Sequence, residues 1–138
     1  MDSFTNMITY YILIVDDERD DHFFLNAALK RIIPNAIIES LYDGSEAVKY
    51  LETCITWPNL IFLDLNMHRL SGKETIKVIR KNPSLSKVPV IILTTSRNED
   101  EKNEMLALGA TAFYSKPYNY KELDGIVKEV RDKYLSDY

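Results

Sequence analysis

An α/β fold with a parallel five-stranded sheet is predicted by three features of the sequence. Short apolar runs alternate along the chain with longer segments of helical period. Three of these runs are continuously apolar, as strands that are covered on both faces should be. Four of the helical segments follow a strand candidate and begin with a capping side chain three residues before a glutamate. Alternating strands and helices of this kind form a parallel sheet with helices on both of its faces.

The apolar runs predict five strands in chain order. These are Tyr10–Val15, Ala36–Tyr42, Leu60–Leu63, Val88–Leu93 and Thr111–Ser115. A helix is expected after each of them. The first and last helices show apolar residues at i, i+3, i+4 and i+7, namely Leu25, Ala28, Leu29 and Ile32, and Leu123, Ile126, Val127 and Val130.

Polar side chains mark the starts of the last four helices, and one glycine marks the end of the fourth. The predicted N-caps, each three residues before a glutamate, are Asp43, Ser71, Ser96 and Asn119. Gly109 stands where the fourth helix should stop, because glycine adopts the left-handed conformation that commonly follows a helix.

These elements form a (βα)5 unit without an obvious linker or repeat. Right-handed crossovers favour a flavodoxin-like, doubly wound sandwich with strand order 2-1-3-4-5. We therefore expect residues 1–138 to be a single domain, with its core at about residues 10–134. In such a sheet the functional crevice lies beyond the carboxyl ends of the strands, where strands 1 and 3 meet.

Composition excludes several classes of protein. The 138 residues are 46% hydrophobic and 28% charged, and the net charge is −4, which argues against direct binding to nucleic acid. Cys54 is the only cysteine, so no internal disulfide can form, and a small buried apolar role is expected for it. Neither a signal peptide nor a bilayer-spanning segment is apparent. The sequence thus predicts a soluble, cytoplasmic protein without a membrane partner.

Chemically reactive side chains follow four of the predicted strands. Asp16 and Asp17 end the first strand, Asp64 ends the third, Thr94 and Thr95 end the fourth, and Lys116 follows the fifth. Three adjacent carboxylates repel one another unless a cation neutralises them. Mg²⁺ suits a site that combines a few carboxylates, water and a phosphate, and Mn²⁺ is the alternative ion. A carboxylate in such a site can attack a phosphoryl group and form an acyl phosphate.

Each of these residues also has an ordinary interpretation. An Asp-Asp pair after a strand is often a turn, and a threonine such as Thr94 often satisfies local backbone groups. A Lys-Pro pair such as Lys116-Pro117 usually belongs to a loop. The joint pattern, with an acid pair, an acid, a hydroxyl and a lysine after different strands in this order, is much harder to obtain by chance.

With these motifs, "ILIVDDE", "LIFLDLNM…LSG", "PVIILTTS" and "AFYSKP", the chain resembles the receiver domain of two-component response regulators, the family of the bacterial chemotaxis regulator. The resemblance covers roughly residues 10–134. It implies that Asp64 accepts the phosphoryl group and that Asp16, Asp17, Asp64 and the backbone carbonyl of Asn66 hold Mg²⁺. It also implies that Thr94 is the switch hydroxyl and that Lys116 contacts the phosphate.

Three further expectations follow from the resemblance. The Lys116-Pro117 bond is cis in the family. Phe113 occupies the position of the switch aromatic residue, and it has no hydroxyl, so packing alone would drive its movement, with Tyr114 facing the surface or a partner. Asn66 and Ser96 stand where the family tunes hydrolysis of the acyl phosphate, and Thr95 lies between the switch hydroxyl and Ser96.

His68 departs from the family pattern, which has proline four residues after the acceptor. It is interpreted first as an exposed loop histidine. A partner contact or a pH-sensitive group near the phosphoryl is the second interpretation, and metal ligation or phosphorylation of His68 itself is the weakest. His22, in the first turn of the first helix, is expected to be exposed or to face a kinase.

The resemblance implies a stand-alone response regulator receiver that takes phosphate from a sensor histidine kinase or a phosphotransfer protein. Its output would pass through the surface of helix 4, strand 5 and helix 5 to an unknown output protein. The resemblance leaves open whether the protein forms a homodimer. Such a protein is not an enzyme beyond its own phosphorylation and dephosphorylation.

Three alternatives remain at the level of sequence. A haloacid-dehalogenase-type phosphohydrolase would need a second acid where Asn66 stands, and a cap region. A scaffold domain that has lost phosphorylation would not need the complete residue set. Flavin binding rests on analogy of fold alone, and the acidic loop "DDERDD" would repel its phosphate.

Overall fold

The computed structural model describes residues 8–135 and contains a parallel sheet between two layers of helices. Its strands are β1 (Tyr10–Val15), β2 (Ala36–Leu41), β3 (Leu60–Leu63), β4 (Val90–Thr94) and β5 (Ala112–Ser115). Its helices are α1 (Arg19–Ile32), α2 (Gly44–Thr53), α3 (Gly72–Lys81), the 3₁₀ turn η2 (Pro83–Leu85), α4 (Glu99–Ala107) and α5 (Tyr120–Tyr134). The strand order is β2-β1-β3-β4-β5, so the predicted flavodoxin-like topology is confirmed.

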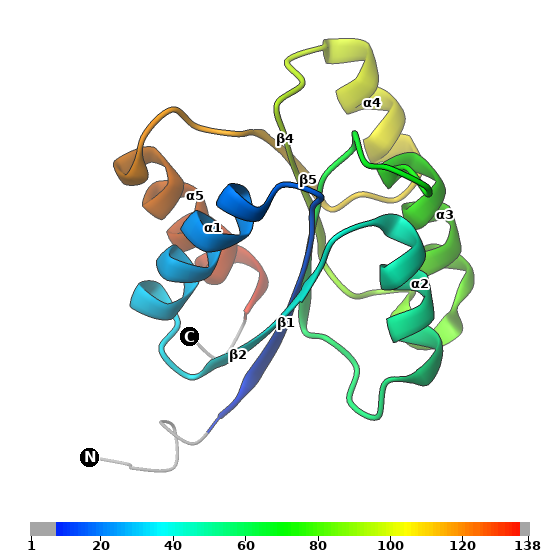
Figure 1. Ribbon diagram of the computed structural model, residues 1–138, viewed down its shortest axis with the longest axis horizontal. Helices are drawn as coiled ribbons and strands as arrows, with labels where there is room; N and C mark the ends of the chain where they lie inside the picture. The colour runs from blue at the N-terminus through cyan, green and yellow to red at the C-terminus, as the bar shows by residue number, and fades with distance from the viewer. Residues whose placement is uncertain (1–7, 136–138) are drawn as a thin grey trace.

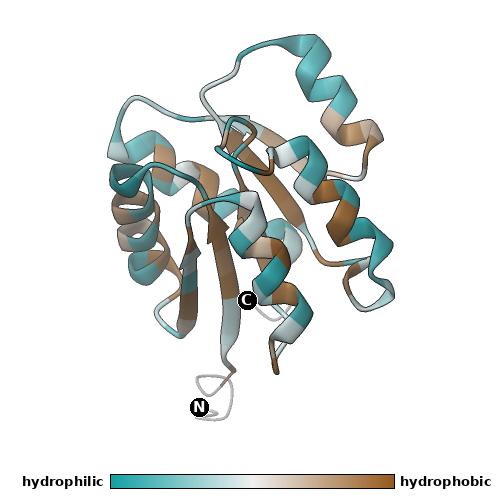
Figure 2. Cartoon of the chain, turned by 45° about the vertical axis from the view of Figure 1, so that its right-hand side comes forward, coloured by the Kyte–Doolittle hydropathy of each residue, from teal (hydrophilic) through white to brown (hydrophobic). Residues whose placement is uncertain are grey.

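The two helical layers bury opposite faces of the sheet. Figure 1 shows α1 and α5 side by side on one face and α2, α3 and α4 on the other. Successive strand residues point to opposite faces, so Ile12 and Ile14 of β1 join the core beneath α1 and α5, whereas Leu13 and Val15 join the core beneath the other layer. This is why the central strands are apolar without interruption, and the hydropathy colouring of Figure 2 shows them as the brown centre of the molecule.

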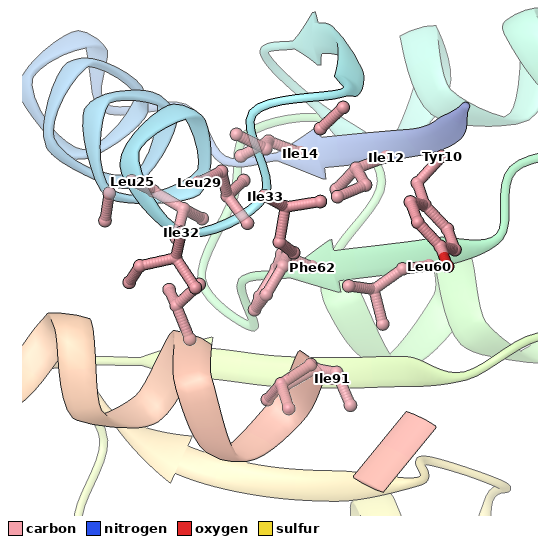
Figure 3. Packing of buried hydrophobic residues seen from close by; sticks show 14 of the residues in the cluster. Tyr10, Ile12, Ile14, Leu25, Leu29, Ile32, Ile33, Leu60, Phe62 and Ile91 are labelled. Carbon is pink, nitrogen blue, oxygen red and sulfur yellow. The ribbon is translucent and has the colours of Figure 1, made fainter. Parts of the chain in front are cut away.

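The core beneath α1 and α5 is built mostly from aliphatic side chains, together with the aromatic rings of Tyr10 and Phe62. Figure 3 shows Phe62 of β3 between Ile33, at the end of α1, and Ile91 of β4. All three side chains are at most 1% exposed. Close packing on both faces of β3 fixes the position and direction in which this strand ends, and therefore the position of the residue that follows it.

Helix starts are mostly those predicted. The side chain of Asp43 accepts a hydrogen bond from the backbone N–H of Glu46, and Asn119 accepts one from that of Glu122. Ser71 and Glu74 form a complete capping box at the start of α3. The prediction was wrong for α4, whose N-cap is Asn98 instead of Ser96. Asparagine caps as well as serine, and the Ser96 hydroxyl binds the Glu101 side chain instead.

Other boundaries differ from the prediction by one or two residues. β2 ends at Leu41, because the backbone N–H of Tyr42 donates to the Glu46 side chain. β4 begins at Val90, because Pro89 has no N–H with which to continue the ladder towards Val88. Gly109 follows α4 with a positive φ of 111°, as its position predicted. Cys54 is only partly buried, so the interpretation as a buried apolar residue was too strong.

Candidate functional site

The register of the sheet brings the predicted site residues to one edge. Val15 pairs with Leu63, and Thr94 pairs with Ser115. The residues that follow these strands therefore emerge side by side at the carboxyl edge, and the backbone N–H of Asp64 donates to the carbonyl of Val15 at 3.0 Å. The N–H of Lys116 donates to the carbonyl of Thr94 at 2.6 Å, which ties the loop after β5 to β4.

Three carboxylates gather at this edge. One oxygen each of Asp16, Asp17 and Asp64 lie within 4.8 Å of one another. Asp16 is 5% exposed and Asp64 is 6% exposed, whereas Asp17 is half-buried. Carboxylate oxygens at this density and burial suit a hard divalent cation, because such an ion offsets their repulsion and their loss of water.

Hydrogen bonds orient the two buried acids. Asp64 Oδ1 accepts from the backbone N–H of Leu65 at 2.7 Å, and Asp16 Oδ1 accepts from that of Glu18 at 2.9 Å. Their second oxygens face the ammonium of Lys116, at 3.4 Å from Asp64 Oδ2 and 2.8 Å from Asp16 Oδ2. Each acid is thus held by its own chain on one side and presents its other oxygen to the site.

The charges in this cluster do not balance. Burial raises the pKa of Asp16 to about 6, although the bonds to Lys116 and Glu18 lower it. Burial alone would lower the pKa of Lys116, but hydrogen bonds to Asp16 and Asp21 and the charges of Asp16 and Asp64 raise it above its ordinary value. Lys116 is therefore charged at neutral pH. Its single positive charge does not neutralise all of the carboxylates around it, so the cluster keeps an excess of negative charge.

The remaining residues predicted for the site lie in or around it. Thr94 is fully buried at the end of β4, and its hydroxyl accepts from the backbone N–H of Ser96 at 3.4 Å. Thr95 is exposed and Ser96 is partly buried. Asn66 is exposed, two residues beyond Asp64. Phe113 is partly buried in β5 and packs against the core beneath α2, α3 and α4.

The two histidines differ in burial. The His68 side chain is 90% exposed and its Nε2 lies 3.6 Å from Asp17 Oδ2, so it is an exposed loop residue at the rim of the site. The expectation for His22 was wrong. It is 4% exposed, its Nε2 lies 2.6 Å from the carbonyl oxygen of Asp16, and its ring lies against Tyr42. His22 therefore supports the β1–α1 loop from beneath.

Two more expectations are settled by the geometry. Every peptide bond within residues 8–135 is trans, so the Lys116-Pro117 bond is not cis as the resemblance implied. The trans form is the lower in energy even before proline. Tyr114 is partly buried and donates from its hydroxyl to Glu129 Oε2 at 2.6 Å, so this side chain is bound to α5.

Sequence reasoning missed Asp21, whose Oδ2 lies 2.6 Å from Lys116 Nζ. The signal was present, because the apolar stripe of α1 includes Leu25, and continuing it one turn towards the N-terminus reaches Asp21 and His22, four and three residues earlier. Both side chains consequently face the sheet edge. No helix within residues 8–135 is long and apolar enough to cross a bilayer.

Comparison with known proteins places this geometry in a family. The model of the response regulator receiver domain matches residues 12–128. Response regulator Rcp1 of Synechocystis is 33% identical over 129 residues, which cover 90% of this chain and 88% of Rcp1. Protein PilG of Pseudomonas aeruginosa is 28% identical over 117 residues, which cover 85% of this chain and 84% of PilG.

Solved structures agree with these sequence relationships. The phosphorylated cyanobacterial phytochrome response regulator RcpA superposes with a TM-score of 0.86 at 30% identity, over 95% of this chain and 97% of RcpA. The Mn²⁺-bound form of Rcp1 superposes with a TM-score of 0.82 at 32% identity, over 92% of this chain and 95% of Rcp1. From its fold, its acidic cluster and these relatives, the chain belongs to the response regulator receiver domain family of two-component signalling.

Proposed function

We propose that this protein is a phospho-receiver in which Asp64 accepts a phosphoryl group from a histidine kinase or a phosphotransfer protein. The observation that carries the proposal is the position of the Asp64 carboxylate. Its Oδ2 lies 3.4 Å from the ammonium of Lys116, and one of its oxygens lies within 4.8 Å of an oxygen of Asp16 and of Asp17. A nucleophilic carboxylate, a cation-binding cluster and a fixed ammonium are the groups that phosphoryl transfer needs.

The transfer is a displacement at phosphorus. A carboxylate oxygen of Asp64 forms a bond to the phosphorus, the P–N bond of the donor phosphohistidine breaks, and its electron pair returns to the imidazole nitrogen. The product is an acyl phosphate on Asp64. Lys116 and the buried hydroxyl of Thr94 are the donors that bind the phosphoryl oxygens.

A bound divalent cation would supply the positive charge that offsets the carboxylates and the phosphoryl oxygens. Asp16, Asp17, Asp64 and the backbone carbonyl of Asn66 are the groups that would hold it, and the cluster of three carboxylates fits that role. Mg²⁺ is the ion that we expect, with Mn²⁺ as a substitute, because both take oxygen ligands and the Rcp1 relative binds Mn²⁺.

The signal would leave the site through β4 and β5. Thr94 and Ser96 share a hydrogen bond, and the Ser115 hydroxyl donates to the carbonyl of Ser96 at 2.9 Å. A shift of Thr94 towards the phosphoryl group would therefore displace the β4–α4 loop and β5, where Phe113 is partly buried. We expect the surface of α4, β5 and α5 to shift between two states and to be read by an output protein or by a second copy of this chain in the cytoplasm.

Residues next to the reacting groups would set the lifetime of the acyl phosphate. Asn66 and Ser96 are polar but neither acid nor base, so neither can activate water strongly. His68 lies at the rim, 3.6 Å from Asp17, which is close enough for contact with a docked partner. The protein would catalyse only its own phosphorylation and dephosphorylation.

The proposal is tested with a small-molecule donor such as acetyl phosphate in the presence of Mg²⁺. We expect intact-mass analysis to show the addition of one phosphoryl group to the wild-type protein, which EDTA and Asp64→Asn both abolish. Asp43→Asn is a matched control, because Asp43 is a buried acid at the neighbouring α2 N-cap and lies outside the cation cluster. Retention of labelling in Asp64→Asn, or labelling that is independent of Mg²⁺, would contradict the assignment.

A further inference from the structure

Besides Asp16 and Asp64, Lys116 is bound by a third acid that the proposed phosphoryl-transfer site does not require. Asp21, in the first turn of α1, places Oδ2 at 2.6 Å from the Lys116 ammonium. Among the ion pairs that Lys116 makes within residues 8–135 this is the shortest, since Asp16 lies at 2.8 Å and Asp64 at 3.4 Å. At 2.6 Å the contact is at the short end of charge-assisted hydrogen bonds.

Asp21 differs from the other two partners of Lys116, because it is not placed to bind a cation instead of the lysine. Asp16 and Asp64 belong to the carboxylate group that could hold a cation, whereas Asp21 does not belong to any such group within residues 8–135. A bound cation therefore competes with Lys116 for Asp16 and Asp64, but leaves Asp21 to the lysine. Asp21 is then the anion that a phosphoryl group on Asp64 has to displace from the ammonium.

Partial exposure of Asp21 lowers the free-energy cost of that displacement. Its side chain is 36% exposed, while that of Lys116 is only 13% exposed. Asp21 also lies in the wall of a cavity of about 330 Å³ between α1 and the start of α5, which Phe24, Tyr118 and Tyr120 line as well. Once released, the carboxylate has open space beside it and is partly exposed to solvent, so it exchanges partners without being buried unpaired.

The opposite role, in which Asp21 holds Lys116 in place for catalysis, is less consistent with the contacts. Lys116 is already fixed through its own backbone, whose N–H donates to Thr94 at 2.6 Å, and its side chain is mostly enclosed. Its ammonium lies nearer to Asp21 than to Asp64. The charge of Asp21 also repels an incoming phosphoryl group, so both of its effects weaken phosphoryl binding.

We propose that Asp21 is a positioning residue that competes with the phosphoryl group for Lys116 and so lowers the affinity of the site for phosphoryl groups. The proposal rests on the proposed function of Asp64. It concerns a residue that sets how readily the site is loaded, and it adds no group to the chemical step itself.

The test is the binding of beryllofluoride, a phosphoryl analogue, in saturating Mg²⁺. Because a partly exposed ion pair is lost, we expect Asp21→Asn to bind beryllofluoride about threefold to fivefold more tightly than the wild type. Asp21→Glu, which keeps the charge, should restore the wild-type affinity. Asp20→Asn removes an equal charge from an exposed neighbour in the same turn and should leave the affinity within about twofold. An unchanged or weaker affinity in Asp21→Asn overturns the proposal.

A second readout does not depend on Mg²⁺. In EDTA, the protons of the ¹⁵N-labelled Lys116 ammonium should exchange slowly with water in the wild type and in Asp20→Asn. They should exchange faster in Asp21→Asn. Unchanged protection in Asp21→Asn would show that this ion pair does not hold the lysine and would overturn the proposal. If wild-type protein fails to bind beryllofluoride at all, the function proposed for Asp64 fails, while the ammonium signal still decides whether Asp21 holds Lys116.

Discussion

Replacing Asp16 by asparagine should make the protein more stable in the absence of a divalent cation. Burial raises the pKa of Asp16 from 3.8 to about 6. The folded protein therefore binds this proton more tightly than the unfolded chain, and ionisation of Asp16 costs folding free energy as the pH rises from about 4 to about 6. The difference corresponds to about 3 kcal/mol above pH 6 at most, since each pKa unit is about 1.4 kcal/mol.

The net gain should be smaller, because asparagine offers Lys116 a neutral partner in place of a charged one at 2.8 Å. We expect Asp16→Asn to raise the free energy of unfolding by about 1–2 kcal/mol at pH 7 in EDTA. The measurement is urea unfolding at pH 7 and at pH 4, followed by circular dichroism. At pH 4 the difference from wild type should shrink towards zero, because the wild-type carboxyl group is then largely protonated in the folded state.

Added Mg²⁺ should reverse the order of the two proteins. The wild type gains about 2.7 kcal/mol when the ion is present at one hundred times its dissociation constant, and the variant gains less because it has lost a ligand. Asp20→Asn, at an exposed position in the first turn of α1, should stay within about 0.5 kcal/mol of wild type at either pH. An Asp16→Asn protein that is less stable than wild type at pH 7 in EDTA would refute the reasoning, since the buried acid would then be a net stabilising group.

Three further changes test the fold around the site by urea unfolding. Phe62→Ala should cost about 3–5 kcal/mol, because the ring is 1% exposed in the core and its removal leaves a cavity; a cost below about 1 kcal/mol would mean that this core collapses freely. Gly72→Ala should destabilise the protein by about 1–3 kcal/mol and slow labelling of Asp64, because an added Cβ would lie 2.3 Å from the carbonyl oxygen of Asp64; unchanged labelling would show that the loop moves aside. Asn119→Ala should cost about 1 kcal/mol through loss of the N-cap of α5, whereas Asn119→Asp should keep it; equal stabilities of the two variants would argue against capping as the cause.

Strands and their order could be predicted because the central strands are covered on both faces and bounded by strong signals. Continuous apolar runs identified β1, β3 and β4, and the alternation with helices left few arrangements of a parallel sheet. Helix starts were predicted less uniformly, because a capping pattern shows which side chains are suitable and not which of them the backbone uses. Ser96 was predicted to cap α4, but the backbone N–H of Glu101 donates to Asn98, and the Ser96 hydroxyl binds the Glu101 side chain.

Positions of the site residues followed from topology, since residues that directly follow neighbouring parallel strands must meet at one edge. Asp16, Asp64 and Lys116 were brought together in this way. Contacts made by helix side chains were harder to predict from the sequence, because they depend on the rotation of α1 about its axis against the sheet. That rotation buried His22 and aimed Asp21 at the lysine, and a polar residue on an apolar stripe is easily taken for a surface residue.

Two close backbone approaches confine the loop between β3 and α3. A Cβ on Gly44 would lie 2.3 Å from the carbonyl oxygen of Leu70, and one on Gly72 would lie 2.7 Å from Cα of Leu65. Both ends of the loop are therefore clamped, whereas His68 and Arg69 in its middle are exposed, and Arg69 has a positive φ of 65°. Substitutions at His68 should therefore leave Asp64 in place, whereas Arg69 accepts only residues that tolerate a positive φ. A library that varies His68, together with those residues at Arg69 that tolerate a positive φ, would therefore change the rim beside the acidic cluster and leave Asp64 where it is, so it would test whether this rim contributes to the choice of the proposed phosphoryl donor.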